Sequence, residues 1–75
     1  MRRYTIILEA DAEEGGYTVI IHALPGCVTQ GETVDDCIER AKEAIAGYIE
    51  SLEAHGEPVP EEKEPLRAIV VDVAA

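Results

Sequence analysis

The sequence is short of several residue types, and each shortage excludes a class of protein. Its 2 Cys are too few for the disulfide framework of a small secreted domain. It holds no Phe and no Trp, so aliphatic side chains must supply most of its core. No stretch of about 18 apolar residues is present, which excludes a membrane-spanning helix. Basic residues are scarce as well, since 6 Lys and Arg stand against 16 Asp and Glu and give a formal net charge of −10. This balance disfavours nucleic acids and anionic membranes as partners and favours a basic protein.

The chain length limits the fold to one small domain, covering residues 1–75. A hydrophobic content of 47% argues against disorder. A domain of this size buries only a thin core, so self-association is expected to contribute to its stability. The apolar run 6–8 behind Arg2 and Arg3 ends at Glu9 and is too short for a signal peptide. The predicted location is therefore the cytoplasm.

Changes in local composition predict six segments along the chain. Three stretches are rich in β-branched and aromatic residues, and turns containing glycine or proline separate them. A long amphipathic stretch follows, and after it three prolines forbid both helix and central strand. The predicted segments are strands at 3–9, 17–22 and 27–30, a helix at 34–55, a Pro-rich acidic connector at 56–65, and a final strand at 66–73.

The helix has the clearest signals in the sequence. Thr33 is a good N-cap residue, and Asp36 three residues later resembles the acid of a capping box. Gly56 is a natural stop after the last turn, and Pro58 lies just beyond it. Apolar residues recur at spacings of three and four along one side, and acidic residues lie on or beside the opposite side. We therefore expect the apolar side to pack on a sheet.

The predicted strands carry apolar residues on both faces, whereas a single helix covers only one face of a sheet. The expected fold is therefore α+β, with a two-layer β-β-β-α-β arrangement and one uncovered sheet face. We predict that another chain covers this second face. The candidate self-association residues are Thr5, Ile7, Thr18, Ile20, Ile69, Val71 and Val73.

Short motifs in a fixed order make the chain similar to a known family. They are Gly15, Gly16 and Tyr17, then Leu24, Pro25, Gly26 and Cys27, then Thr29, Gly31 and Thr33, followed by Asp35, Asp36 and the stretch 41–45 that leads to Tyr48. On these motifs, the segment from about Tyr4 to Pro60 resembles the HicB-type antitoxins of bacterial and archaeal toxin–antitoxin pairs. The resemblance implies a partial ribonuclease-H-like fold, with a sheet ordered 3-2-1-4 and one long helix on one face. It also implies a homo-oligomer, dimeric or tetrameric, and a HicA partner, a small basic toxin that degrades mRNA by means of a histidine.

The chain departs from the family pattern at several points. Cys37 stands where the family usually has alanine, and Arg40 stands where a small polar residue is common. Many family members also append a domain that binds DNA, whereas this sequence has no basic segment suited to reading DNA. It therefore resembles a short form of the family, for which direct DNA binding is not expected.

The predicted function is that of an antitoxin that binds and occludes a small basic HicA-like toxin. No catalytic residue, metal site or cofactor is predicted. The charges of the helix and connector leave two interpretations open, a docking surface for a basic partner or a solvated face. The candidate partner-binding residues are Asp36, Glu39, Glu43, Glu50, Glu57, Glu61, Glu62 and Glu64.

Two other functions are compatible with the sequence. One is a solitary homo-oligomeric domain without a toxin partner. The other is a small metal-dependent nuclease in which Glu9 and Asp72, on neighbouring strands, hold divalent cations. The spacing of the cysteines and histidines matches no compact pattern of zinc ligands.

Overall fold

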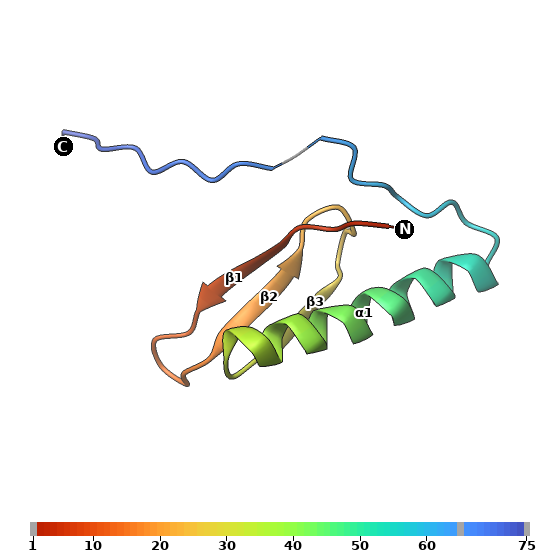
Figure 1. The fold of residues 1–75 in the computed structure, drawn as a ribbon, viewed down its shortest axis with the longest axis horizontal. Coiled ribbons are helices and arrows are strands. Elements are labelled where there is room, and N and C mark those ends of the chain that lie inside the picture. The colour runs from red at the N-terminus through yellow and green to blue at the C-terminus, as the bar shows by residue number, and fades with distance from the viewer. Residues whose placement is uncertain (1, 65, 75) are drawn as a thin grey trace.

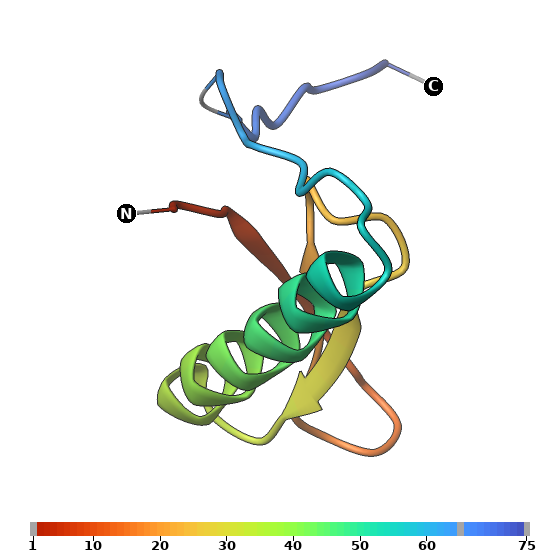
Figure 2. The same ribbon diagram turned by 90° about the vertical axis from the view of Figure 1, so that its right-hand side faces the viewer.

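A long helix packs on one face of a three-stranded antiparallel sheet (Figure 1). The computed structural model describes residues 2–64 and 66–74. Its elements are β1 (Ile6–Ala10), β2 (Tyr17–Ile21), β3 (Val28–Gly31) and α1 (Val34–Ala54), and the strands lie in the order β1-β2-β3. Figure 2 shows the two layers nearly end-on. The α+β class with one long helix is therefore confirmed.

The β1–β2 hairpin is closed by a turn that the sequence builds locally. Ile7 pairs with Ile20 on the face of the sheet that the helix does not cover. In the loop, the Asp11 carboxylate accepts the backbone N–H groups of two following residues at 3.0 and 3.1 Å. Gly15 and Gly16 then take φ values of +80° and +70°, which residues with a Cβ rarely adopt. These contacts return the chain in register along β1.

The hydrophobic core lies between α1 and the sheet, mainly over β2 and β3. Leu24 and Cys27 enter this core from the turn between β2 and β3, so the Leu-Pro-Gly-Cys motif supplies core side chains as well as turn geometry. The Tyr48 hydroxyl of α1 donates to the Pro25 carbonyl oxygen at 2.7 Å and holds the turn against the helix. The buried core residues are Val19, Ile21, Leu24, Cys27, Cys37 and Ala41.

Two glycines bring β3, the hairpin loop and the start of α1 close together. A Cβ atom at Gly31 would lie 2.7 Å from Cys37 Sγ and 2.8 Å from Cys37 N. A Cβ atom at Gly16 would lie 2.7 Å from the Gly31 carbonyl oxygen. All three distances are shorter than a carbon atom tolerates, so glycine at these positions allows the close approach of strand, loop and helix.

Both ends of α1 are capped by the residues that the sequence indicates. The Thr33 hydroxyl accepts the Asp36 N–H at 3.1 Å, and the Asp36 carboxylate reaches back to the Glu32 N–H at 2.8 Å. Gly56, with φ +68°, donates to the Glu53 carbonyl, and the next residue donates to the Leu52 carbonyl at 2.9 Å. This pair of bonds is the Schellman motif. Within the described residues, no helix combines the length and the apolarity that crossing a membrane requires.

The prediction of a strand at 66–73 is wrong for the single chain. Residues 66–74 run extended and exposed, apart from the sheet, and none of them is in a strand (Figure 1). The connector crosses the start of β1, where the Tyr4 hydroxyl donates to the Pro60 carbonyl oxygen at 2.7 Å. Beyond this attachment the chain runs above the sheet and apart from it (Figure 1). The fourth position of the expected 3-2-1-4 order is therefore unfilled among the described residues.

Candidate partner-binding surface

The outer side of α1 carries a line of carboxylates, called the acidic stripe here and defined as Asp36, Glu39, Glu43 and Glu50. Spacings of three, four and seven residues place these side chains on one side of a helix with 3.6 residues per turn. Cys37 and Ala41, on the opposite side, are buried against the sheet. The acidic stripe therefore faces away from the core.

The four acids of the stripe differ in how far they are already engaged. Asp36 lies 3.5 Å from Arg40, and the Glu32 N–H bond and this guanidinium hold the pKa of Asp36 below its usual range. Glu39 lies 3.5 Å from Lys42, but both side chains are about 70% exposed and such a pair contributes little. Glu43 and Glu50 are exposed and take part in neither of these ion pairs. The second half of the stripe therefore offers its charge to solvent or to a partner.

A glycine lies within the second half of the acidic stripe. Gly47 lies on the same side of α1 as Glu43 and Glu50, and nothing lies within 4 Å of the place where its Cβ would stand. Glycine in a helix interior costs about 1 kcal/mol relative to alanine. The bare backbone at this point leaves room for another molecule to approach the helix closely.

The connector extends the negative charge beyond the end of the helix. Of its acids, Glu57, Glu61 and Glu64 are exposed, whereas Glu62 turns inward to the start of β1. Residues 34–64 contain ten acids and three bases, and thus hold most of the net charge of −10. A surface with one dominant sign of charge raises the association rate of a partner with the opposite sign.

Glu62 is a structural residue as well as a surface charge. Its carboxylate accepts the Thr5 N–H at 2.7 Å and also the Thr5 hydroxyl. These two bonds hold the pKa of Glu62 below its ordinary value of 4.5. Thr5, a candidate self-association residue, is thereby engaged within its own chain. Together with the bond from Tyr4 to Pro60, this contact attaches the connector to the sheet.

We expect Glu62→Gln to release the connector from β1, because an amide replaces a carboxylate that accepts both Thr5 groups. The Thr5 amide should exchange its hydrogen several-fold faster in the variant. The contact lowers the pKa of Glu62, so it favours the ionised carboxylate and is lost when this carboxylate takes up a proton. The wild-type attachment should therefore persist at neutral pH and weaken as the pH falls below 4.5. Amide exchange by NMR between pH 7 and pH 3 measures both effects.

The matched control for this prediction is Glu61→Gln, which removes the same charge from an exposed neighbour. It should leave the exchange of the Thr5 amide unchanged. Equal acceleration in the two variants would show that net charge, and not the contact with Thr5, governs the attachment.

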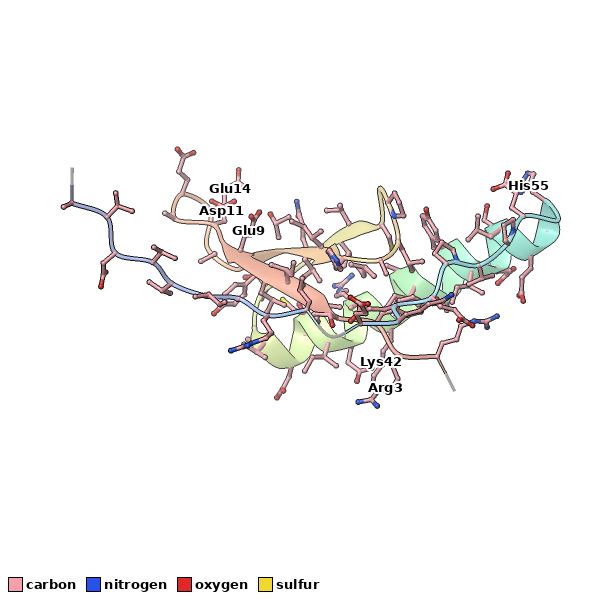
Figure 3. All side chains as sticks on the ribbon, turned by 90° about the horizontal axis from the view of Figure 1, so that it is seen from above. Arg3, Glu9, Asp11, Glu14, Lys42 and His55 are labelled. Atoms are coloured by element: carbon pink, nitrogen blue, oxygen red, sulfur yellow. The ribbon has the colours of Figure 1, made fainter. Side chains whose placement is uncertain are left out.

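The fold also gathers acids of the hairpin loop and of the start of α1 around one hollow. A polar hollow of about 260 Å³ lies beside the first acid of the stripe and is lined by Asp11, Glu14, Glu32, Asp36 and Arg40, among others. Asp11 and Glu14 lie at the same end of the molecule as Glu9 (Figure 3). The sequence signal for this hollow is the pair Gly16 and Gly31, which lets the hairpin loop approach the start of α1. Four carboxylates around one hollow suit a basic side chain of a partner.

The candidate self-association residues fall into two separate groups. Ile7 and Ile20 lie opposite each other on the uncovered sheet face, and Val28 pairs with Ile20 there and is 54% exposed. Thr18, on the same face, pairs with Glu9 and Gln30. The structure does not join the other group to this face, because it lies on the extended C-terminal segment. Its members Ile69, Val71 and Val73 are 70%, 72% and 78% exposed.

The residues named for a nuclease or a metal site are dispersed in the structure. Glu9 is exposed on β1, but Asp72 lies in the extended segment, so the adjacent strands that would join them are not formed in the single chain. No group of three or more His, Cys, Asp or Glu able to hold a metal ion occurs within residues 2–64 and 66–74. Cys27 and Cys37 are free and buried, and burial raises the pKa of both thiols. Both cysteines act as small core residues.

Comparison with known proteins gives a consistent result. The family described as HicB-like antitoxin of bacterial toxin-antitoxin system matches residues 4–73. A UPF0150 protein of Thermoplasma acidophilum is 50% identical over 58 residues, which cover 77% of this chain and 83% of that protein. A UPF0150 protein of Synechocystis is 46% identical over 59 residues, 79% of this chain and 73% of that protein. Antitoxin HicB of Escherichia coli K12 is 38% identical over 58 residues, which cover 77% of this chain but 41% of that longer protein.

Proposed function

This chain belongs to the HicB-like antitoxin family, and we propose that it binds and occludes a small basic HicA-like toxin that degrades mRNA. Its role is binding and not catalysis. The observation that carries the proposal is the acidic stripe, a line of carboxylates on the side of α1 that the core leaves free.

The chemistry of the toxin explains why an acidic surface would inhibit it. A protein that degrades mRNA must neutralise phosphates with Lys and Arg around its active site. An antitoxin that presents carboxylates at helical spacing offers those basic groups an alternative set of anions. Once the antitoxin covers them, the mRNA backbone has no basic surface on which to bind.

The proposal includes a location and an assembly. The antitoxin acts in the cytoplasm, because that is where a toxin that degrades mRNA meets its substrate. It is a homo-oligomer, a dimer or a tetramer, which buries the apolar groups that one chain leaves exposed. These groups are the sheet face around Ile7, Ile20 and Val28 and the C-terminal segment 66–74.

The test is binding to the HicA-like protein of a neighbouring gene after reversal of charge on the stripe. Glu43→Lys with Glu50→Lys should raise the Kd by about tenfold or more, mainly through slower association, and should weaken its dependence on salt. Association and dissociation rates at two salt concentrations, measured by surface plasmon resonance, separate these effects. Both residues are exposed on the helix, so the variant should fold normally.

The matched control places the same charge change on another surface. Glu9→Lys with Glu13→Lys alters an exposed strand residue and an exposed loop residue, and it should leave the Kd within about twofold of the wild-type value. An equal loss of affinity in both variants would refute the stripe as the interface and leave net charge as the cause. If the wild-type chain forms no complex and does not rescue growth from the toxin, the proposed pairing is wrong.

A further inference from the structure

The C-terminal segment 66–74 has the composition of a strand but pairs with none of the strands that the structure describes. Among its residues Ile69, Val70, Val71 and Val73 are β-branched, and all four are at least 70% exposed. The segment draws the molecule out to 48 Å in its longest dimension, against 28 and 20 Å in the others. The radius of gyration is 14.4 Å, whereas a compact chain of this length has about 11 Å.

The sheet has an open edge at β1. The His22 N–H donates to the Thr5 carbonyl at 3.1 Å, and the Asp11 N–H donates to the Gly16 carbonyl at 3.0 Å. With the register of the hairpin, these bonds direct the backbone groups of the odd-numbered residues of β1 toward β2.

The even-numbered residues Ile6, Leu8 and Ala10 therefore direct their N–H and C=O groups away from β2. Among the described residues, β2 is the only strand that pairs with β1. Such an edge pairs readily with an extended segment.

We infer that two copies of this chain exchange their 66–74 segments, each segment pairing as a strand with the open β1 edge of the other copy. The inference rests on the homo-oligomer proposed above and supplies its mechanism. In this reciprocal exchange the β1 edge of each copy pairs with the segment of the other copy. The result is a closed dimer with two-fold symmetry. It also supplies the fourth strand that the single chain lacks.

The length and the charge of segment 66–74 both suit pairing with the β1 edge of a second copy. Nine residues in extended conformation span about 30 Å, which exceeds the roughly 17 Å of a five-residue strand such as β1. Two chains of charge −10 repel each other, but segment 66–74 contains one Arg and one Asp and is therefore neutral. The contact thus joins two acidic molecules through parts that carry little charge.

The path of the connector favours pairing of the segment with β1 of a second copy over pairing with β1 of its own chain. The contacts of Tyr4 with Pro60 and of Thr5 with Glu62 hold the connector at the start of β1. From there the segment runs in the same general direction as β1 but stays apart from the sheet and does not pair with β1 (Figure 1). A segment held extended and clear of its own sheet is already in the conformation that an exchanged strand requires.

Cross-linking between differently tagged chains tests the exchange. One chain carries Glu9→Cys on β1 and the other carries Asp72→Cys in the segment; the two are unfolded, mixed, refolded and treated with a short bismaleimide. The native Cys27 and Cys37 are at most 5% exposed and should react slowly. We expect a cross-link between the two tags at least tenfold more abundant than with Gly47→Cys, on the outer side of α1, in place of Glu9→Cys.

Three results distinguish the inference from its premise. A dimer by light scattering without the cross-link between tags overturns the exchange and leaves self-association standing. A cross-link confined to a single chain that carries both cysteines means that the segment pairs with its own β1, which also overturns the exchange. A monomer at all concentrations overturns both.

A second variant tests the role of the segment without touching the folded body. Val70→Pro combined with Val71→Pro removes the N–H groups of two consecutive residues, one of which must face β1 in any register, and both residues are at least 72% exposed in the single chain, so the fold of residues 2–64 should be unaffected. The dimer dissociation constant should rise at least about tenfold. Val70→Thr combined with Val71→Thr keeps the β-branched shape and both N–H groups and should leave the constant nearly unchanged. An unchanged constant in the proline variant would contradict the inference.

Discussion

Gly31→Ala should lower the free energy of unfolding by about 3 kcal/mol, the upper end of the usual range for overpacking. The added methyl would lie within 2.9 Å of three atoms of Cys37, two of which are backbone atoms of the first helical turn. Backbone atoms cannot move aside as a flexible side chain does, so β3 and α1 must separate. For a domain of this size, that loss is a large part of the total stability. Urea denaturation followed by circular dichroism measures the change.

The matched control for this result is Gly47→Ala, the same substitution in the middle of α1. Nothing lies within 4 Å of that Cβ position, so alanine should raise the free energy of unfolding by about 1 kcal/mol through its better helix propensity. The two substitutions should therefore act in opposite directions. A loss of stability at Gly47, or none at Gly31, would contradict the tight contact of strand and helix.

Leu24→Ala should lower the free energy of unfolding by about 3 kcal/mol, within the usual range of about 2 to 5 kcal/mol for a buried leucine. Leu24 is fully buried although it belongs to a turn. Its removal would leave a cavity beside Val19 and Ile21, which are among the largest fully buried side chains. Thermal unfolding should show a decrease of more than about 10 °C in Tm.

The control here is Leu66→Ala, which removes the same atoms from a residue of the C-terminal segment that is 39% exposed. In dilute protein it should change the free energy of unfolding by less than about 0.5 kcal/mol. A similar loss at both leucines would mean that the segment packs on the body more tightly than the structure of one chain shows.

The features of this fold that can be predicted from the sequence depend on residues close together along the chain. The capping residues Thr33 and Gly56 act through hydrogen bonds to residues within five positions, so a short window of sequence contains both partners. The amphipathic pattern of α1 is local in the same sense. The order of the short motifs predicts membership of the HicB-like antitoxin family, and the match of that family to residues 4–73 confirms it.

The features missed from the sequence all depend on contacts between distant residues. Leu24 was expected in a turn, and its burial follows from the helix that packs over that turn. Asp11 and Asp36 line one hollow only because small residues let the hairpin loop reach the start of α1. The contact of Glu62 with Thr5 spans 57 positions along the chain. No local pattern contains such a pair.

The sequence by itself determined the α+β class, the caps of the helix, the acidic stripe and the family. Only the tertiary structure decided that segment 66–74 stands apart from the sheet and that no second strand of residues 2–64 and 66–74 pairs with β1. The physical reason is that β-branched composition describes how well a residue fits a strand, whereas a strand exists only when a partner supplies the other half of its hydrogen bonds. Side-chain spacing likewise places the stripe on α1, but the packing of α1 on the sheet decides that the stripe faces outward.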